Sequence, residues 1–184
     1  MAAEPQVEFD TTMGKIKLEL FPQAAPKTVD NFLQYVKAGF YDGTQFHRVI
    51  DGFMIQGGGF DDKLQQKPTR APIPNEGAEN QKAGAKNIIG TIAMARTGDP
   101  HSATAQFFIN VANNAPLDYT ASTPQGYGYT VFGKVIEGMD VVNKIAKTET
   151  GMQGGHGNVP KMPIVVRKAS VVEAGDKGAP AKKE

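Results

Sequence analysis

One stretch decides how this chain folds: Phe46-His47-Arg48-Val49-Ile50-Asp51-Gly52-Phe53-Met54-Ile55-Gln56-Gly57-Gly58. It holds two short runs of β-branched and aromatic residues on either side of Asp51-Gly52, which is a strong signal for a tight turn between antiparallel strands. The loop length decides which side chains share a face, because side chains alternate between the two faces of a strand. The stretch therefore predicts a β-hairpin over residues 44–57.

Two registers fit this hairpin. A two-residue turn places Arg48 opposite Ile55. A three-residue loop, with Gly52 at a positive φ angle, places Arg48 opposite Gln56 instead. The second register gathers a cation, a soft apolar side chain and an amide on one face, with an aromatic ring at the corner: Arg48, Met54, Gln56 and Phe53. We favour the second register because it makes a site.

Outside the hairpin, most apolar residues follow the spacing of strands. Further strands are expected around residues 7–9, 15–20, 87–95, 106–111, 129–136 and 163–172. Helical spacing occurs at residues 29–36, ahead of Gly39, and at residues 139–145. Residues 61–86 and 151–157 lack either period and are expected to be loops. The sequence thus predicts a mainly β fold, a closed eight-stranded antiparallel β-barrel capped by two α-helices.

Composition narrows the class of protein. The length of 184 residues suits one domain, expected over residues 7–173, with a flexible N-terminus at 1–6 and a disordered tail at 174–184. The net charge of +1 argues against binding to nucleic acid or to a membrane surface. The chain has no cysteine, which excludes disulfides and thiolate metal sites. No apolar stretch has the length of a signal peptide or a membrane span, so we expect a cytoplasmic protein.

Few side chains follow the pattern of a nucleophile or a metal site. Ser102 lies beside His101 but outside any nucleophile motif. The histidines His47, His101 and His156 lack metal-ligand spacing, and we expect His47 to serve packing or hydrogen bonding.

Arg48 stands out. An arginine within an apolar strand is unfavourable unless its guanidinium is paired or faces a cleft. Taken alone, Arg48 suits a structural ion pair. The nearby pocket-forming residues shift the interpretation toward a polar group aimed into an apolar pocket: Phe53, Met54, Gln56 and Phe108.

Three motifs resemble, in order, the signatures of the cyclophilin family of peptidyl-prolyl cis-trans isomerases. They are the opening stretch at residues 46–58, Met94-Ala95-Arg96 followed by Ala105-Gln106-Phe107-Phe108-Ile109, and Val131-Phe132-Gly133-Lys134-Val135. The resemblance runs from about Val7 to Glu173 and is closest to the cytoplasmic bacterial branch. It implies an isomerase of X-Pro peptide bonds that assists protein folding, without cofactor or metal.

The resemblance also implies the residues of the site. Arg48 would be the catalytic residue, and a proline pocket would be formed by Phe53, Met54, Phe108 and Leu117. Substrate contacts would come from Gln56, Gln106, Tyr129 and the chain around Ala95, Arg96 and Thr97, with His47 and Pro116 at the rim. The implied partners are proline-containing peptides and unfolded or folding proteins, bound by a monomer.

Pro116 departs from the family pattern. The family commonly has an aromatic residue, often tryptophan, before the leucine that Leu117 matches. Proline supplies no indole N–H and covers less of the pocket wall. Weak binding of the inhibitor cyclosporin is therefore expected, whereas isomerase activity should remain because Arg48 is present.

Two functions from other classes compete with this reading. A proline-recognition or chaperone module with incidental turnover would use the same groove. A β-barrel carrier of small apolar ligands needs a hollow interior. Three large side chains argue against a hollow barrel: Phe107, Ile109 and Phe132.

Overall fold

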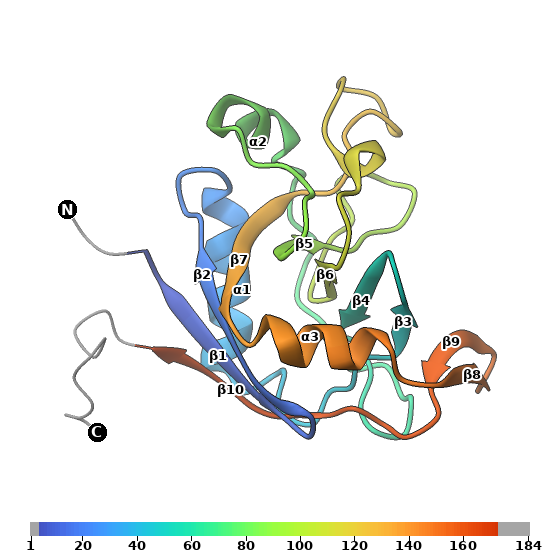
Figure 1. Cartoon of the computed structure of the whole chain (residues 1–184). Coiled ribbons are helices and arrows are strands. Elements are labelled where there is room, and N and C mark those ends of the chain that lie inside the picture. The colour runs from blue at the N-terminus through green and yellow to red at the C-terminus, as the bar shows by residue number, and fades with distance from the viewer. Residues whose placement is uncertain (1–3, 173–184) are drawn as a thin grey trace.

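A computed structural model describes residues 4–172. Residues 1–3 and 173–184 lie outside it, and with them the predicted tail and half of the predicted flexible N-terminus. Within residues 4–172 the elements follow in the order β1 (Gln6–Thr11), β2 (Gly14–Leu20), α1 (Pro26–Lys37), β3 (Arg48–Ile50), β4 (Met54–Gly57), α2 (Gly77–Ala83), β5 (Thr91–Met94), β6 (Phe107–Asn110), the 3-10 helix η1 (Ala115–Leu117), β7 (Val131–Glu137), α3 (Met139–Ala146), β8 (Thr150–Gln153), β9 (His156–Pro160) and β10 (Val166–Val172) (Figure 1).

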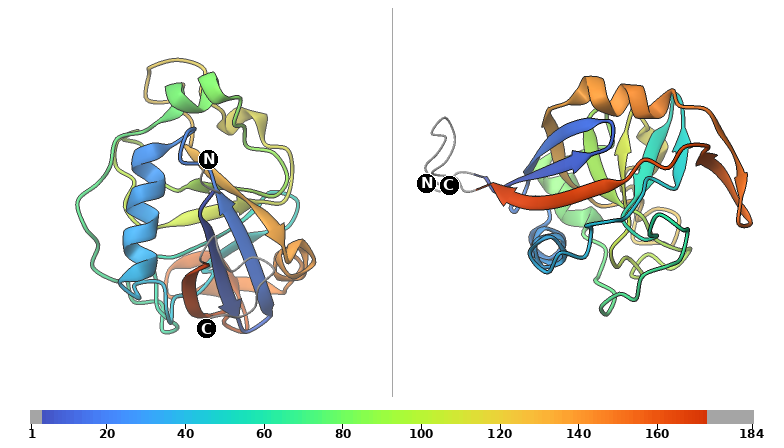
Figure 2. Two further views of the ribbon diagram at one scale, coloured as in Figure 1. Left: turned by 90° about the vertical axis from the view of Figure 1, so that its left-hand side faces the viewer. Right: turned by 90° about the horizontal axis from the view of Figure 1, so that it is seen from below.

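Eight strands form one antiparallel sheet in the order β10-β1-β2-β7-β5-β6-β4-β3 within the described residues. The sheet curls into a half-barrel, with α1 and α3 on opposite sides of it (Figure 2). The segment that precedes β3 is hydrogen-bonded to the chain around the start of β10: Gly43 N donates to Val166 O at 2.8 Å, and Phe46 N to Ile164 O at 2.9 Å. The predicted mainly β, eight-stranded antiparallel fold is confirmed, and these bonds span the seam of the half-barrel.

Aromatic side chains fill the space inside the curled sheet. Phe9, Phe32, Phe107 and Phe132 are fully buried, and the distances between their neighbouring ring centroids are 4.9–6.2 Å. Such ring pairs stabilise the core beyond the area they bury. The interior is therefore occupied by side chains, as predicted, and leaves no basis for a hollow carrier of apolar ligands.

Helix α1 forms where the sequence has the predicted apolar stripe. Val29, Phe32 and Val36 are buried against the core. Pro26 suits the first helical position, where the backbone N–H has no partner within the helix. Gly39, with φ at 74°, follows the last turn and lets the chain leave the helix.

The N-terminus of α1 is capped by a residue far away in the sequence. Ala25 at the N-cap has no side chain that accepts a hydrogen bond. The buried carboxylate of Glu76 accepts instead from the backbone N–H groups of Lys27 at 3.1 Å and Thr28 at 2.8 Å, and from the Thr28 hydroxyl at 2.8 Å. This negative charge also lies at the positive end of the helix dipole.

The structure corrects two loop assignments. The described residues contain a third α-helix, α2, within the predicted loop 61–86, and a β8–β9 ribbon where a glycine-rich loop was expected at 151–157. Helix α2 has only seven residues and buries only Gly77 and Asn80, so it leaves no apolar stripe in the sequence. The ribbon turns at Gly154-Gly155, both at positive φ. Its strands are short and carry few apolar residues, so the sequence shows no alternation of apolar and polar side chains there.

Candidate active site

The β3–β4 hairpin adopts the second of the two registers. Arg48 pairs with Gln56, and Ile50 pairs with Met54. Gly52 has a φ of 78°, and Phe53 N donates to Ile50 O at 3.0 Å to close the loop. The prediction of a three-residue loop is confirmed. Its consequence is that Arg48 and Gln56 project from adjacent strands to the same place.

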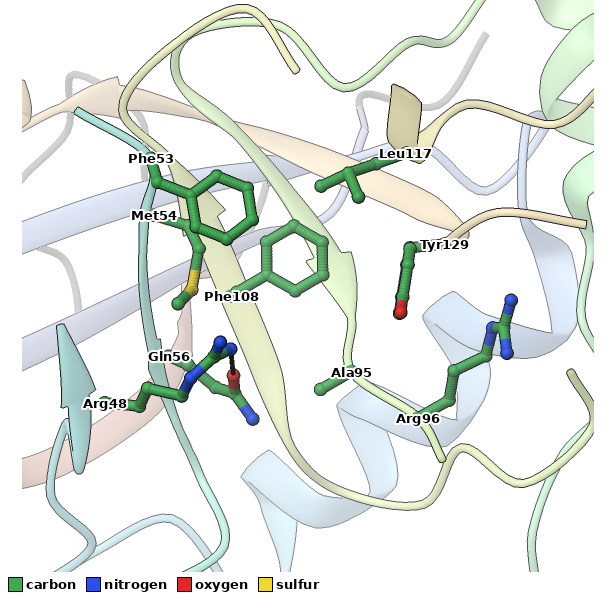
Figure 3. Close-up of a pocket in the computed structure, with 9 residues that line it drawn as sticks. All are labelled: Arg48, Phe53, Met54, Gln56, Ala95, Arg96, Phe108, Leu117 and Tyr129. Carbon is green, nitrogen blue, oxygen red and sulfur yellow. Dashed lines mark hydrogen bonds between the residues drawn. The ribbon is translucent and has the colours of Figure 1, made fainter. Parts of the chain in front are cut away.

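A groove with a volume of about 370 Å³ opens on this face of the sheet. Strand β6 pairs with β4 on one side and with β5 on the other, which places side chains of β4 and β6 and of the chain that follows β5 along the groove. Nine residues line it, with apolar side chains in the middle and a guanidinium group at each end: Arg48, Phe53, Met54, Gln56, Ala95, Arg96, Phe108, Leu117 and Tyr129 (Figure 3). The structure thus brings together nine of the predicted site residues.

Arg48 is exposed at its end of the groove and held by amides. Its Nη1 donates to Gln56 Oε1 at 3.1 Å, and Gln56 Nε2 donates to Gln106 Oε1 at 2.9 Å. The ion pairs of the described residues do not include Arg48. The structure therefore does not support a structural ion pair at Arg48. Its guanidinium keeps free N–H donors beside the apolar pocket.

The opposite wall of the groove is held from behind by Asn87, which is 1% exposed. Asn87 Nδ2 lies within hydrogen-bond distance of the Leu117 carbonyl at 3.1 Å and of the Tyr129 carbonyl at 3.3 Å. Asn87 Oδ1 accepts from Asn110 Nδ2 at 3.0 Å. One buried amide therefore fixes the backbone of two residues that line the groove.

Asn114 extends this network to the near wall. Its Nδ2 lies 3.0 Å from the Phe53 carbonyl and 2.8 Å from Asn110 Oδ1. None of the three asparagines, Asn87, Asn110 and Asn114, was predicted from the sequence to belong to the site. Their spacing matches no motif, and asparagine is a frequent residue in turns, so its presence alone does not indicate a site. The one indication in the sequence was Asn110, a polar residue within an apolar strand.

The remaining predicted residues lie around the groove. Gln106 is not among the groove-lining residues but contacts one of them, since it accepts the hydrogen bond from Gln56. Thr97 lines a neighbouring hollow. Pro116 is exposed in η1 and is not among the groove-lining residues.

His47 is buried, with its ring against Phe60 and near His156 at centroid distances of 4.5 and 6.2 Å. Its Nδ1 has no hydrogen-bond partner among the described residues. Burial lowers the pKa of His47 from 6.5 to about 4, and the proximity of His156 and Arg48 acts in the same direction. The lowered pKa favours the neutral imidazole, which packs against Phe60.

Within residues 4–172 no helix is long and apolar enough to cross a membrane. The same residues contain no group of three or more His, Asp or Glu side chains placed to bind a metal ion.

Known proteins resemble this chain in both sequence and fold. Residues 6–171 match the family model described as cyclophilin type peptidyl-prolyl cis-trans isomerase/CLD. The chain is 58% identical to peptidyl-prolyl cis-trans isomerase cyp18 of Streptomyces antibioticus, over 90% of this chain and 98% of that protein. It is 53% identical to peptidyl-prolyl cis-trans isomerase B of Escherichia coli, over 91% and 99% of the two chains. Its fold is similar to a crystal structure of a cyclophilin type isomerase from Cryptosporidium parvum, with a TM-score of 0.73, 25% identity, and coverage of 92% and 98%.

Proposed function

The chain belongs to the cyclophilin type peptidyl-prolyl cis-trans isomerase family, and we propose that it catalyses rotation about X-Pro bonds in the groove between Arg48 and Tyr129. One observation carries the assignment of the groove: a guanidinium without a carboxylate partner among the described residues faces a pocket of apolar side chains. Rotation about a peptide bond transfers no group between molecules. An enzyme for it needs a pocket that holds the proline and one well-placed hydrogen-bond donor, and we propose that the groove provides both.

The size of the task follows from the peptide bond. Nitrogen donates its lone pair into the carbonyl, which sets a rotation barrier of roughly 18–20 kcal/mol. Uncatalysed X-Pro exchange takes tens to hundreds of seconds. A turnover time of about a millisecond requires the activation free energy of this rotation to be lower by about 7 kcal/mol.

We propose that Arg48 supplies part of this difference. In the twisted transition state the lone pair returns to the prolyl nitrogen, which becomes a hydrogen-bond acceptor. An N–H of Arg48 donates to that nitrogen only in the twisted state, so the interaction lowers the barrier without tightening the ground state. Gln56 Oε1 holds Nη1 at 3.1 Å, which limits the rotamers that the long arginine side chain must lose at the transition state.

The apolar middle of the groove holds the proline ring. Met54 and Phe108 form the floor and are 2% and 4% exposed, while Phe53 and Leu117 form partly exposed walls. A ring fixed between these side chains cannot follow the rotation, so the acyl side of the bond turns instead. The low polarity of the walls strengthens the hydrogen bond from Arg48.

Refolding of a protein limited by proline isomerisation tests this assignment. The wild type should accelerate it at catalytic concentrations, and Arg48→Ala should lose at least about tenfold in kcat/KM, equivalent to about 1.4 kcal/mol at the transition state. Arg70→Gln is a matched control, because Arg70 bonds Gln34 and stacks on Tyr35, and is not among the groove-lining residues.

Each outcome is informative. Equal acceleration by the wild type and Arg48→Ala would move the catalytic role to another residue. Peptide binding without acceleration by the wild type would favour the proline-recognition module.

Three further properties belong to this proposal. Weak binding of cyclosporin is supported by the exposed position of Pro116, outside the groove lining. A monomer is supported by the origin of all nine lining residues in one chain. A cytoplasmic location is supported by the resemblance to the cytoplasmic bacterial branch.

A further inference from the structure

A second hollow adjoins the groove at the end opposite Arg48. Its volume is about 570 Å³, and it is lined by Arg96, Thr97, Gly98, Pro124, Gln125 and Tyr129. Arg96 and Tyr129 line both the hollow and the groove. A peptide that places its proline in the groove therefore has a continuous surface to follow, since each extended residue advances the chain by about 3.3–3.6 Å.

The side chain of Arg96 makes this hollow a rigid feature. Its guanidinium lies over the Tyr129 ring, 4.7 Å from the centroid. Its nitrogens donate to four backbone carbonyls on two segments of chain: Gly128 at 2.8 Å, Thr97 at 2.9 Å, Pro124 at 3.0 Å and Gly98 at 3.4 Å. These bonds tie the loop that carries Pro124 and Gln125 to the chain that follows β5, so both walls of the hollow are fixed before any ligand arrives.

The charge of the guanidinium is not matched by a carboxylate. Arg96 takes part in none of the ion pairs of the described residues. Aspartate and glutamate are absent from the described lining of the hollow and of the groove. Asp99 is the acidic residue next in sequence, and its Oδ1 accepts from His101 N at 2.9 Å. Since the whole chain has a net charge of only +1, the positive charge here is a local feature.

We propose that this hollow is a second subsite for the substrate peptide and that it selects an acidic side chain near the proline. The proposal rests on the isomerase function assigned above and adds a substrate preference to it. Arg96 attracts the carboxylate through its charge and its remaining N–H, while the Gln125 amide offers a polar contact at an exposed rim.

The test compares proline peptides that carry glutamate or glutamine at each position flanking the proline. Their cis-trans exchange is followed by NMR, so that no coupling protease imposes its own preference. At low salt the kcat/KM ratio of glutamate to glutamine should be about threefold at one position or at two adjacent ones, as expected for one exposed charge pair. Raising the salt from about 0.01 M to about 1 M shortens the Debye length from about 30 Å to about 3 Å and should bring the ratio close to one.

Variants identify the source of the preference. Arg96→Gln should abolish it, and Arg70→Gln, which removes an equal charge outside both hollows, should leave it unchanged. Gln125→Glu keeps Arg96 and its bonds, changes only an exposed side chain, and should reduce the ratio to one or below. This variant keeps the test valid if Arg96→Gln fails to fold.

Two results would overturn the proposal. One is a ratio of one at every position in the wild type, with the glutamine peptides turned over normally. The other is an equal loss of preference in Arg70→Gln and Arg96→Gln, which would assign it to net charge. Failure to accelerate any peptide would instead refute the isomerase function, so the two failures are distinct.

Discussion

Replacing Asn87 with alanine would remove the amide that holds the far wall of the groove. The two N–H groups of its Nδ2 are shared among the carbonyls of Leu117 and Tyr129 and Asp118 Oδ1 at 3.1 Å, and its Oδ1 accepts from Asn110 Nδ2. At a net value of about 1 kcal/mol for each of two donated bonds and one accepted bond, their loss should lower the free energy of unfolding by about 3 kcal/mol. Release of Leu117 and Tyr129 should also raise KM by about fivefold, which corresponds to about 1 kcal/mol of binding.

Asn80→Ala is the matched control for this prediction. Asn80 is also buried, at 4% exposed, and its amide makes three hydrogen bonds of 2.7–3.0 Å to the backbones of Ala24 and Val131. Neither partner lines the groove. The control should therefore lose about 3 kcal/mol of stability while KM stays within about twofold of the wild type.

Urea unfolding gives the stabilities of the two variants, and NMR exchange on one proline peptide gives KM and kcat. Both are measured well below the unfolding temperature of the weaker variant. The reasoning is refuted if both variants lose similar stability and their KM values change equally. In that case Asn87 supports the fold as a whole and has no particular effect on the groove.

Three other changes have defined outcomes. Phe108→Ala should raise KM as well as lower kcat, because it removes part of the floor of the proline pocket; a change in kcat alone in the NMR exchange assay would contradict that geometry. Glu76→Gln should cost about 1–2 kcal/mol in urea unfolding, because it removes the charge at the N-terminus of α1 and turns a donor toward Lys27 N; unchanged stability would contradict the capping role. His47 has a pKa of about 4 when folded and 6.5 ordinarily, so the unfolded chain binds more protons between these values. Stability therefore decreases as the pH is lowered from about 6.5 to about 4, by at most about 3 kcal/mol. His47→Phe should flatten this dependence in urea unfolding between pH 7 and 4.5, and an unchanged slope would assign it to other groups.

The sequence was most informative where the decisive contacts are local. The hairpin register depends on residues within one short stretch, so the partner of Arg48 could be inferred from turn chemistry alone. Phe108 could be placed on the same face as Gln106 and Asn110, because side chains alternate along a strand and polar residues stand two positions to either side of it.

Contacts between distant parts of the chain were not predictable in this way. Asn87 meets Leu117 and Tyr129 across 30 and 42 residues, and Glu76 meets Thr28 across 48 residues. No periodicity encodes such pairs, since they exist only once the half-barrel has formed. Arg96 is intermediate: its place in the site followed from its motif, whereas its four carbonyl partners required the structure.

The pairing of β1 with β10 has a consequence for how this domain can be joined to others. Gln6 lies directly opposite Val172 in that ladder, so the two ends of the described fold are only about 5 Å apart. The strands that carry the groove lie at the other end of the sheet order. A short linker between these ends, with the chain reopened at the exposed Gly154-Gly155 turn, would give a circular permutant with every strand of the main sheet in its original register. By the same geometry, the domain can be inserted into a surface loop of a host protein with the groove still free to bind peptides.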